Sequence, residues 1–359
     1  MRIALVASLV SPLRPAEANG PHAVIVDLAR GLAARGHTVT VYAAAGSVAD
    51  EVHIVEIPVE AEAQRASLRV DHTPLAPATA ALNRGFVLLF GRLRHDAPDV
   101  ISQHAFDAAA IELAEGMPVL HTLHLPPMVD DVVAAARATR AALATVSEAA
   151  RVSWQRAGVE NLSVLRNGVP SREPARGATV PVALIAGRVS PEKGTDAAIR
   201  VARSAGLAVM VVGDAYDTGY FAEVVEPLLR PGEWIGPVSR EELAQLMARC
   251  AVTLMPVRWE EPFGLVAAEA QMAGCPVVAY RRGALPEVVP HRIGGWLVEA
   301  DDEVAFVQAI HLARGLDRSS IRSRARRNLG VEQMVDAYEH ALSALVARER
   351  PTVLVRGRT

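Results

Sequence analysis

The sequence predicts an α/β protein with two doubly wound parallel sheets, one in each half of the chain. Short runs rich in Val, Ile and Leu alternate with segments whose apolar residues recur at the helical period. The runs are apolar throughout, as is typical of strands covered by helices on both faces. A stretch with three Pro and two Gly, residues 166–181, interrupts this alternation near mid-chain. The 359 residues suffice for two domains of ordinary size.

In the first half, strands over 2–9 and 38–43 flank a helix over about 22–35, which Gly36 ends. Further strands are predicted over 52–57, 99–103, 118–123, 142–146 and 162–165. The opening run is interpreted as a buried strand and not as a signal peptide, because no small-residue cleavage site follows it. A cytoplasmic location is therefore expected.

The second half repeats the alternation. Strands are predicted over 182–187, 208–213, 251–256 and 276–280, with helices starting near 194, 240 and 264. A last apolar stripe predicts a helix over 331–348 that packs back toward the first domain. The expected domains are residues 1–166 and 182–330, with residues 167–181 as linker.

Composition excludes several classes of protein. With 51% apolar residues and a net charge of −3, the chain is not a disordered polymer, and it has no overall charge suited to nucleic acid. Aromatic residues are only 4%, too few for a base-stacking platform. Cys250 and Cys275 are interpreted as core residues, and no run is long and apolar enough to span a membrane.

Lys193 is the only lysine among 37 Lys and Arg residues. It lies in GRVSPEKG (187–194), a turn that leaves a predicted strand and enters a helix. Arg188 and Lys193 flank this turn, so two cations and the helix amides suit a diphosphate. The segment is not a P-loop, and a solvated surface turn is the alternative.

Two carboxylates eight residues apart mark a second candidate site, in WEEPFGLVAAE (259–269). Glu261 is expected in the loop that leaves strand 251–256, and the following helix directs its first amides to the same place. Leu265, Ala268 and Met272 mark the predicted buried stripe of that helix, and Glu269 stands on it. A carboxylate there needs a partner: a ribose with two hydroxyls, or, as the alternative, an arginine in a buried ion pair.

Two segments of the first half add candidate residues. His124 follows strand 118–123 and is expected at its carboxyl tip, where an imidazole forms hydrogen bonds near neutral pH. No carboxylate stands at a metal-ligand spacing from it, so no metal is expected. The loop Asn19-Gly20-Pro21-His22 would lie under a phosphate, although a plain turn is the alternative.

Residues 83–95, NRGFVLLFGRLRH, combine apolar residues with three arginines. They are either a basic amphipathic surface for peripheral contact with a membrane or an ordinary buried helix with a charged end.

These motifs together resemble the family 4 retaining glycosyltransferases. GRVSPEKG, VVGD, WIGPV, EEPFGLVAAEAQMAGCPVVAY and GALPEVV are similar to that family's second domain, and NGPH, TLH, ATVSEAARVSWQRAG and VLRNGVP to its first. The resemblance extends to about residue 345. It implies the GT-B architecture, in which two doubly wound Rossmann-like domains face an interdomain cleft.

The resemblance also implies roles for individual residues. Arg188 and Lys193 would bind the donor diphosphate, Glu261 the transferred sugar and Glu269 the ribose. The remaining contacts would come from Phe263, Gly264, Leu265 and Val266 to sugar and phosphate, from Gly213 and Val238 to base and phosphates, and from His124 and Gly20 in the first domain. Pro21 departs from the Gly-Gly that the family often has, and it removes one backbone N–H from that loop.

The resulting hypothesis is a retaining, metal-independent glycosyltransferase that uses a nucleotide sugar and no further cofactor. A UDP-sugar is the expected donor, with GDP- and ADP-sugars as alternatives. The acceptor is a small molecule, a lipid-linked compound or a glycan. No D-x-D motif occurs, so fixed cations must stabilise the leaving diphosphate. The rival interpretations are transfer to phosphate or nucleotide, a catalytically silent nucleotide-binding homologue, and an NAD protein, which lacks the glycine fingerprint.

Overall fold

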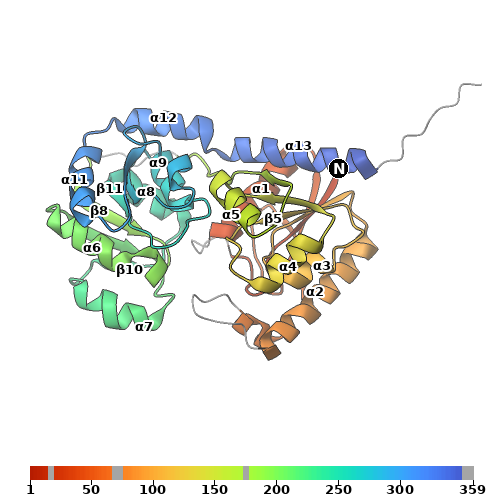
Figure 1. Cartoon of the computed structure of the whole chain (residues 1–359). Coiled ribbons are helices and arrows are strands. Elements are labelled where there is room, and N and C mark those ends of the chain that lie inside the picture. The colour runs from red at the N-terminus through yellow and green to blue at the C-terminus, as the bar shows by residue number, and fades with distance from the viewer. Residues whose placement is uncertain (15–19, 67–75, 173–177, 350–359) are drawn as a thin grey trace, which may run out of the picture.

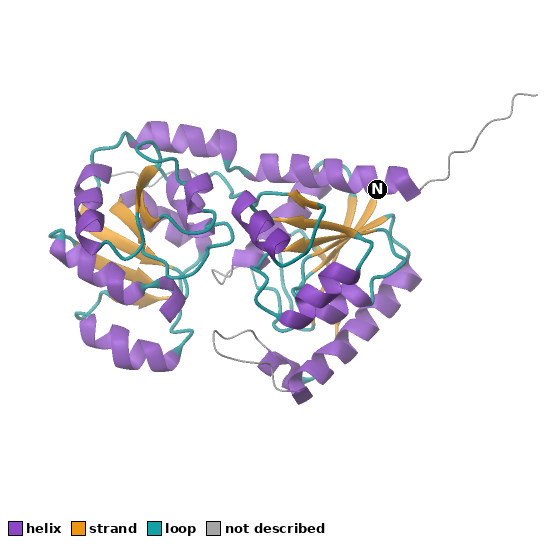
Figure 2. Cartoon of the chain, in the orientation of Figure 1, coloured by secondary structure: helices purple, strands orange, loops and turns teal. Residues whose placement is uncertain are grey.

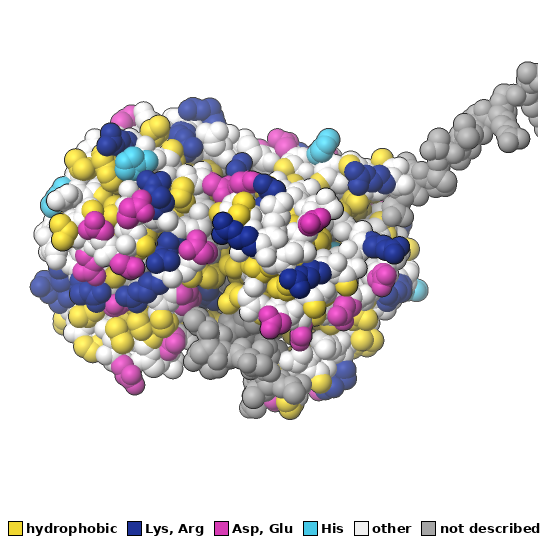
Figure 3. Space-filling model, in the orientation of Figure 1, with side chains coloured by type: hydrophobic (Ala, Val, Ile, Leu, Met, Phe, Trp, Pro, Cys, Tyr) yellow, Lys and Arg dark blue, Asp and Glu magenta, His cyan; other side chains and the backbone are white. Residues whose placement is uncertain are grey.

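The computed structural model describes residues 1–14, 20–66, 76–172 and 178–349. It has two lobes, each built on a parallel sheet with helices on both faces (Figures 1 and 2). This confirms the predicted α/β class with two doubly wound domains. Acidic and basic side chains are mixed over both lobes on the face seen in Figure 3, in keeping with the small net charge.

The first lobe contains a sheet of seven parallel strands in the order β3-β2-β1-β4-β5-β6-β7. Its strands are β1 (Arg2–Val6), β2 (Thr38–Ala44), β3 (His53–Ile57), β4 (Val100–Gln103), β5 (Val119–Leu123), β6 (Ala142–Thr145) and β7 (Leu162–Val164). The helices are α1 (Gly20–Ala34), α2 (Ala76–Asp96), α3 (Ala108–Glu112), α4 (Asp130–Ala138) and α5 (Glu148–Arg156), with a short 3-10 turn η1 (Ala61–Ala66). Each strand predicted here is present, and β1 is buried from Ile3 onward.

The second lobe contains a sheet of six parallel strands in the order β10-β9-β8-β11-β12-β13. These are β8 (Val180–Ala186), β9 (Ala208–Val212), β10 (Trp234–Gly236), β11 (Cys250–Met255), β12 (Val277–Tyr280) and β13 (Gly295–Val298). The helical segments are η2 (Pro191–Lys193), α6 (Thr195–Ser204), α7 (Thr218–Tyr220), η3 (Phe221–Val225), η4 (Glu226–Leu228), α8 (Arg240–Arg249), α9 (Leu265–Met272), α10 (Leu285–Val288), α11 (Glu303–Ala313) and α12 (Arg318–Asn328). The edge strands β10 and β13 were not predicted; each is short and includes a glycine, which weakens a strand pattern.

The last helix, α13 (Val331–Glu349), crosses back and covers the first lobe beside α1 (Figure 1). The packing is close because Gly31 of α1 has no side chain: a Cβ there would lie 2.3 Å from Cγ2 of Val335. Just before α13 the returning chain pairs with the linker, where Val169 and Gly330 form a parallel bridge. The C-terminal helix is thereby part of the first lobe's core.

The segment 83–95 lies within α2 and matches the buried-helix interpretation. Phe86, Leu89, Phe90 and Leu93 are buried in the core, whereas Val87 and Leu88 are exposed. The arginines contact acceptors of the chain itself: Arg84 with Glu60, Arg92 with Asp96, and Arg94 with the Leu113 carbonyl oxygen. Within the described ranges, no helix has the length and apolar character needed to cross a membrane.

Candidate active site

The two sheets bring their ligand-binding edges together. In each sheet the strand order reverses beside the first strand, between β1 and β4 and between β8 and β11. Ligands of doubly wound sheets bind outside the carboxyl ends of the strands at this point. Segments that leave these edges meet across the lobes: the Ser147 hydroxyl donates to the Pro262 carbonyl oxygen at 2.6 Å. A Cβ added to Gly20 would lie 2.7 Å from Cδ1 of Leu265.

The turn after β8 holds the first pair of predicted cations. Gly194, at φ 68°, ends the 3-10 turn η2, and a side chain there would collide with the Pro256 carbonyl oxygen. The Arg188 guanidinium lies 4.6 Å from the Tyr216 ring centroid and 3.5 Å from Oε1 of Glu192. This side chain is held by its neighbours yet remains 42% exposed, so it is accessible to a ligand.

Lys193 and Glu261, predicted as separate site residues, contact each other directly. Nζ of Lys193 lies 2.7 Å from Oε2 of Glu261, and Nε1 of Trp259 donates to the same oxygen at 2.9 Å. The ammonium also lies 4.6 Å from the Trp259 ring centroid, a cation–π geometry. Glu261 is buried, so these two donors compensate the cost of removing its charge from water.

Helix α9 begins at the same place. Gly264 precedes its first residue in the left-handed region, at φ 92°, and no side chain caps the helix. The first amides of a helix have no partner within it, and they carry a partial positive charge. Phe263 is buried beneath the turn, whereas Val266 is partly exposed. Uncapped amides beside Lys193 suit an anionic group.

One part of the predicted pattern in α9 is wrong. Leu265 was expected in the core with Ala268 and Met272, but it is only partly buried and lies against Gly20 of the other lobe. The alanines Ala267, Ala268 and Ala270 are all buried, so the helix packs through a broad small-residue face. Because the alanine face packs against the core, Leu265 and Glu269 lie on the side of the helix that faces the first lobe.

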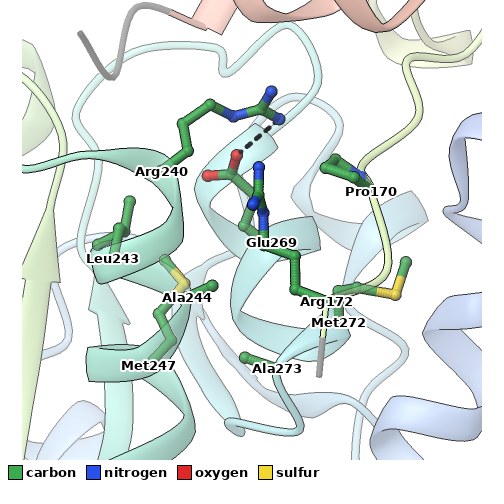
Figure 4. Close-up of a pocket in the computed structure, with 9 residues that line it drawn as sticks. All are labelled: Pro170, Arg172, Arg240, Leu243, Ala244, Met247, Glu269, Met272 and Ala273. Carbon is green, nitrogen blue, oxygen red and sulfur yellow. Dashed lines mark hydrogen bonds and ion pairs between the residues drawn. The ribbon is translucent and has the colours of Figure 1, made fainter. Parts of the chain in front are cut away.

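Glu269 forms an ion pair, which was the alternative reading of its carboxylate. Oε1 of Glu269 lies 3.3 Å from one terminal nitrogen of Arg240 (Figure 4). The other terminal nitrogen of Arg240 lies 2.9 Å from Oδ2 of Asp27 in α1. Burial raises the pKa of Glu269, and Arg240 opposes that shift. The bridge therefore links α8 and α9 of the second lobe to α1 of the first. A pocket opens beside it, lined by Pro170, Arg172, Arg240, Leu243, Ala244, Met247, Glu269, Met272 and Ala273.

His124 lies directly beyond β5, as predicted, and is buried. Burial lowers its pKa to about 4, so the imidazole is neutral at physiological pH. Its Nε2 lies 2.8 Å from Nδ1 of His104, which follows β4, the neighbouring strand. A second histidine in contact with His124 was not predicted.

The remaining predicted residues border the same region. Gly213 follows β9 at φ 142°, where a Cβ would lie 1.9 Å from the Gly187 carbonyl oxygen, so only glycine fits. Val238 is half-buried and precedes Ser239, whose hydroxyl accepts from the Glu242 N–H and caps α8. Asn19, expected in the phosphate loop, and Gly177, in the expected linker, lie outside the described residues.

Sequence reasoning missed Asp27, Arg240, Trp259 and His104. Asp27 had a usable signal, because it is an acidic residue inside the apolar run of α1. Arg240 had none, since an arginine after a helix cap is ordinarily a surface residue. Trp259 belongs to the motif of Glu261, but its indole donor role depends on the loop's conformation.

Solved structures of similar architecture identify the fold. A sucrose-phosphate synthase from Thermosynechococcus elongatus superposes with a TM-score of 0.80 at 17% identity, covering 96% of this chain and 99% of that one. Anabaena HepE in complex with UDP and glucose gives 0.75 at 18% identity, covering 96% and 100%. Two facing doubly wound domains with these neighbours are the GT-B fold of glycosyltransferases.

Sequence comparison narrows the class to a family. The family model described as Glycosyltransferase Family 4 matches residues 18–173, and that described as Glycosyl transferases group 1 matches residues 171–328. The D-inositol 3-phosphate glycosyltransferase of Nocardioides sp. is 26% identical, over 94% of this chain and 87% of its own length. The chain is a glycosyltransferase and belongs to family 4.

Proposed function

We propose that this enzyme transfers a sugar from a nucleotide sugar, with a UDP-sugar as donor, to an acceptor hydroxyl with retention of configuration and without a metal ion. The bond between the sugar's anomeric carbon and the β-phosphate oxygen breaks. The acceptor oxygen bonds to the same face of the anomeric carbon, and its proton passes to the leaving diphosphate. The acceptor is the hydroxyl of a small molecule, a lipid-linked compound or a glycan.

One observation carries the proposal: the cationic turn after β8 and the N-terminus of α9, after β11, lie at the ends of paired strands. Negative charge grows on the diphosphate as its bond to the sugar breaks. Arg188, Lys193 and the amides of Gly264, Leu265 and Val266 offer fixed positive ends for that charge. Phe263, which directly precedes these residues, is buried.

The contacts of Glu261 fit a role at the transferred sugar. Lys193 and Trp259 both engage its Oε2, and no hydrogen bond from the described residues reaches Oε1. Oε1 is then available to accept from a sugar hydroxyl. The same lysine bridges this carboxylate and the diphosphate, so sugar and leaving group are held by one connected set of charges.

Glu269 is assigned to the donor's ribose. Its carboxylate is partly exposed, at 21%, and borders the pocket of Figure 4, whose lining includes the apolar side chains of Leu243, Met247 and Met272. Two vicinal hydroxyls would donate to this carboxylate in charge-assisted hydrogen bonds. Val238 and Gly213 would border the base and phosphates, and Gly20 and His124 would approach from the first lobe. The HepE complex with UDP and glucose supports a UDP-sugar donor by analogy.

The two carboxylates can be tested separately. Glu269→Gln should weaken UDP binding about tenfold or more in calorimetric titration, because the ribose loses a charged acceptor. Glu261→Gln should leave UDP affinity unchanged and lower kcat, since free UDP has no sugar. Glu242→Gln, at an exposed position of α8, is the matched control.

If the two affinities change the other way round, the roles are reversed. If neither variant alters UDP binding or UDP release from a UDP-sugar, the carboxylate pair is structural and the proposed site is wrong.

A further inference from the structure

Three side chains form a continuous line of hydrogen bonds that ends at His124. Oγ of Ser102 lies 2.9 Å from Nε2 of His104, and Nδ1 of His104 lies 2.8 Å from Nε2 of His124. Ser102 lies in β4, and His104 is the first residue after that strand. His124 is the first residue after β5. All three residues are buried.

Which group donates in each hydrogen bond follows from the number of protons that the two neutral imidazoles and the hydroxyl carry. Two facing ring nitrogens form a hydrogen bond only when one of them carries the proton. Were His124 the donor, His104 would carry its proton on Nε2 and donate it to Ser102, whose hydroxyl hydrogen would then have no acceptor. In the part of the chain that the structure describes, the Ser102 hydroxyl has no hydrogen-bond partner besides His104. A buried hydroxyl donor without an acceptor is destabilising, so this direction is disfavoured.

In the opposite direction, every donor of the three side chains that takes part in the line has an acceptor. Ser102 donates to bare Nε2 of His104, and His104 donates from Nδ1 to bare Nε2 of His124. We infer that Ser102 and His104 fix the tautomer of His124, so that this histidine presents an Nδ1–H donor to the cleft.

Two further observations support a fixed, neutral pair. Burial lowers the pKa of His104 and of His124, so neither ring is charged near neutral pH. The Tyr338 ring of α13 stacks on His104, with centroids 5.7 Å apart, and its hydroxyl donates to Oγ1 of Thr122 at 3.2 Å. The C-terminal helix therefore holds the plane of His104 in place. His104 acts through His124, as a positioning residue.

The tautomer assignment does not depend on the proposed function. Only the group that His124 contacts, the transferred sugar, rests on that proposal. An Nδ1–H group donates to an oxygen and cannot remove a proton from a hydroxyl. His124 thus orients the transferred sugar by donating to one of its oxygens, and it is not the base of the reaction. The acceptor proton then has its route through the leaving diphosphate, as proposed above.

The test measures tautomers directly in the full-length protein. Long-range proton–nitrogen correlation spectra of the 15N-histidine-labelled chain distinguish protonated from bare ring nitrogens, and a His124→Asn spectrum assigns the His124 signals. The wild type should show His124 with Nδ1 protonated and Nε2 bare. Ser102→Ala removes the hydroxyl that sets the direction, so a substantial Nε2-protonated population should appear.

A matched pair at His104 tests the same point. His104→Asn places an amide donor near the position of Nδ1 and should keep the wild-type tautomer, whereas His104→Asp places only an acceptor there and should move the proton to Nε2. Ser102→Ala, the mildest change, should lower kcat for a UDP-sugar about fivefold and leave UDP affinity unchanged.

A wild-type spectrum with His124 protonated on Nε2 overturns the inference, as does a Ser102→Ala spectrum identical to the wild type. The spectra need no substrate, so they stand apart from the proposed function. Failure of the wild type to turn over UDP-sugars would refute that function and leave the tautomer assignment intact.

Discussion

The contact between Lys193 and Glu261 predicts that one substitution affects both stability and catalysis. Lys193→Met removes the ammonium while keeping an unbranched side chain that packs on the Trp259 ring. The Glu261 carboxylate, 9% exposed, then keeps one donor, Nε1 of Trp259. A buried carboxylate without its counter-ion opposes folding.

The magnitude follows from these contacts. Removing one partner of a fully buried ion pair costs about 3–5 kcal/mol. Lys193 is 22% exposed and the Trp259 hydrogen bond survives, so we expect about 2–3 kcal/mol here. For a domain of this size, that loss lowers the Tm of the second lobe by about 4–12 °C.

The assay is a double-mutant cycle by calorimetric or denaturant unfolding. Glu261→Gln alone should cost about 1 kcal/mol, because Lys193 can turn toward solvent. Lys193→Met combined with Glu261→Gln should be more stable than the sum of the single changes implies, with a coupling of about 1–2 kcal/mol. Effects that add to within about 0.5 kcal/mol would refute a direct interaction.

Catalysis is measured at a temperature where the variant is fully folded. Loss of one fixed charge at the leaving diphosphate should cost about 2–4 kcal/mol in kcat/KM, or roughly 30- to 1000-fold. Lys193→Arg should recover part of this, because the charge remains while reach and geometry change. Wild-type turnover by folded Lys193→Met would remove Lys193 from the proposed mechanism.

Other expected outcomes follow from the same structure. Activity should persist in excess EDTA, because the sequence has no D-x-D motif and fixed cations serve the diphosphate; a loss restored by metal would contradict this. Burial acts to raise the pKa of Asp196, but hydrogen bonds from Arg258, Tyr220 and Arg200 outweigh it and hold that pKa below its usual range. Asp196→Asn should therefore cost about 2–3 kcal/mol at pH 7, with a difference that shrinks as pH falls below about 4; a difference independent of pH would count against it. Asp27→Asn removes the ion pair to Arg240 across the lobes, so small-angle scattering should show a larger radius, which saturating UDP reduces; an unchanged radius would mean that other contacts hold the lobes together.

The sequence by itself determined the class of fold, and it predicted which residues form the candidate site. Apolar strand runs predicted all seven strands of the first sheet and four of the six strands of the second, because burial on both faces of a parallel sheet leaves a continuous local pattern. Two motifs predicted the candidate site of the second lobe. One is the turn that holds Lys193, the only lysine, and the other contains Glu261 and Glu269. Such motifs can be recognised in the sequence because each one is a continuous segment of the chain.

Contacts between distant segments were decided only by the tertiary structure. Lys193 pairs with Glu261, 68 residues away, and Asp27 with Arg240, 213 residues away. Leu265 faces the other lobe because the alanine face of α9 already fills the core. His104 meets His124 because β4 and β5 are neighbours with matching register. Local periodicity indicates which face of a helix or strand is apolar. The partner of a side chain across the two lobes depends on how the whole sheets are placed. No short stretch of sequence encodes that placement.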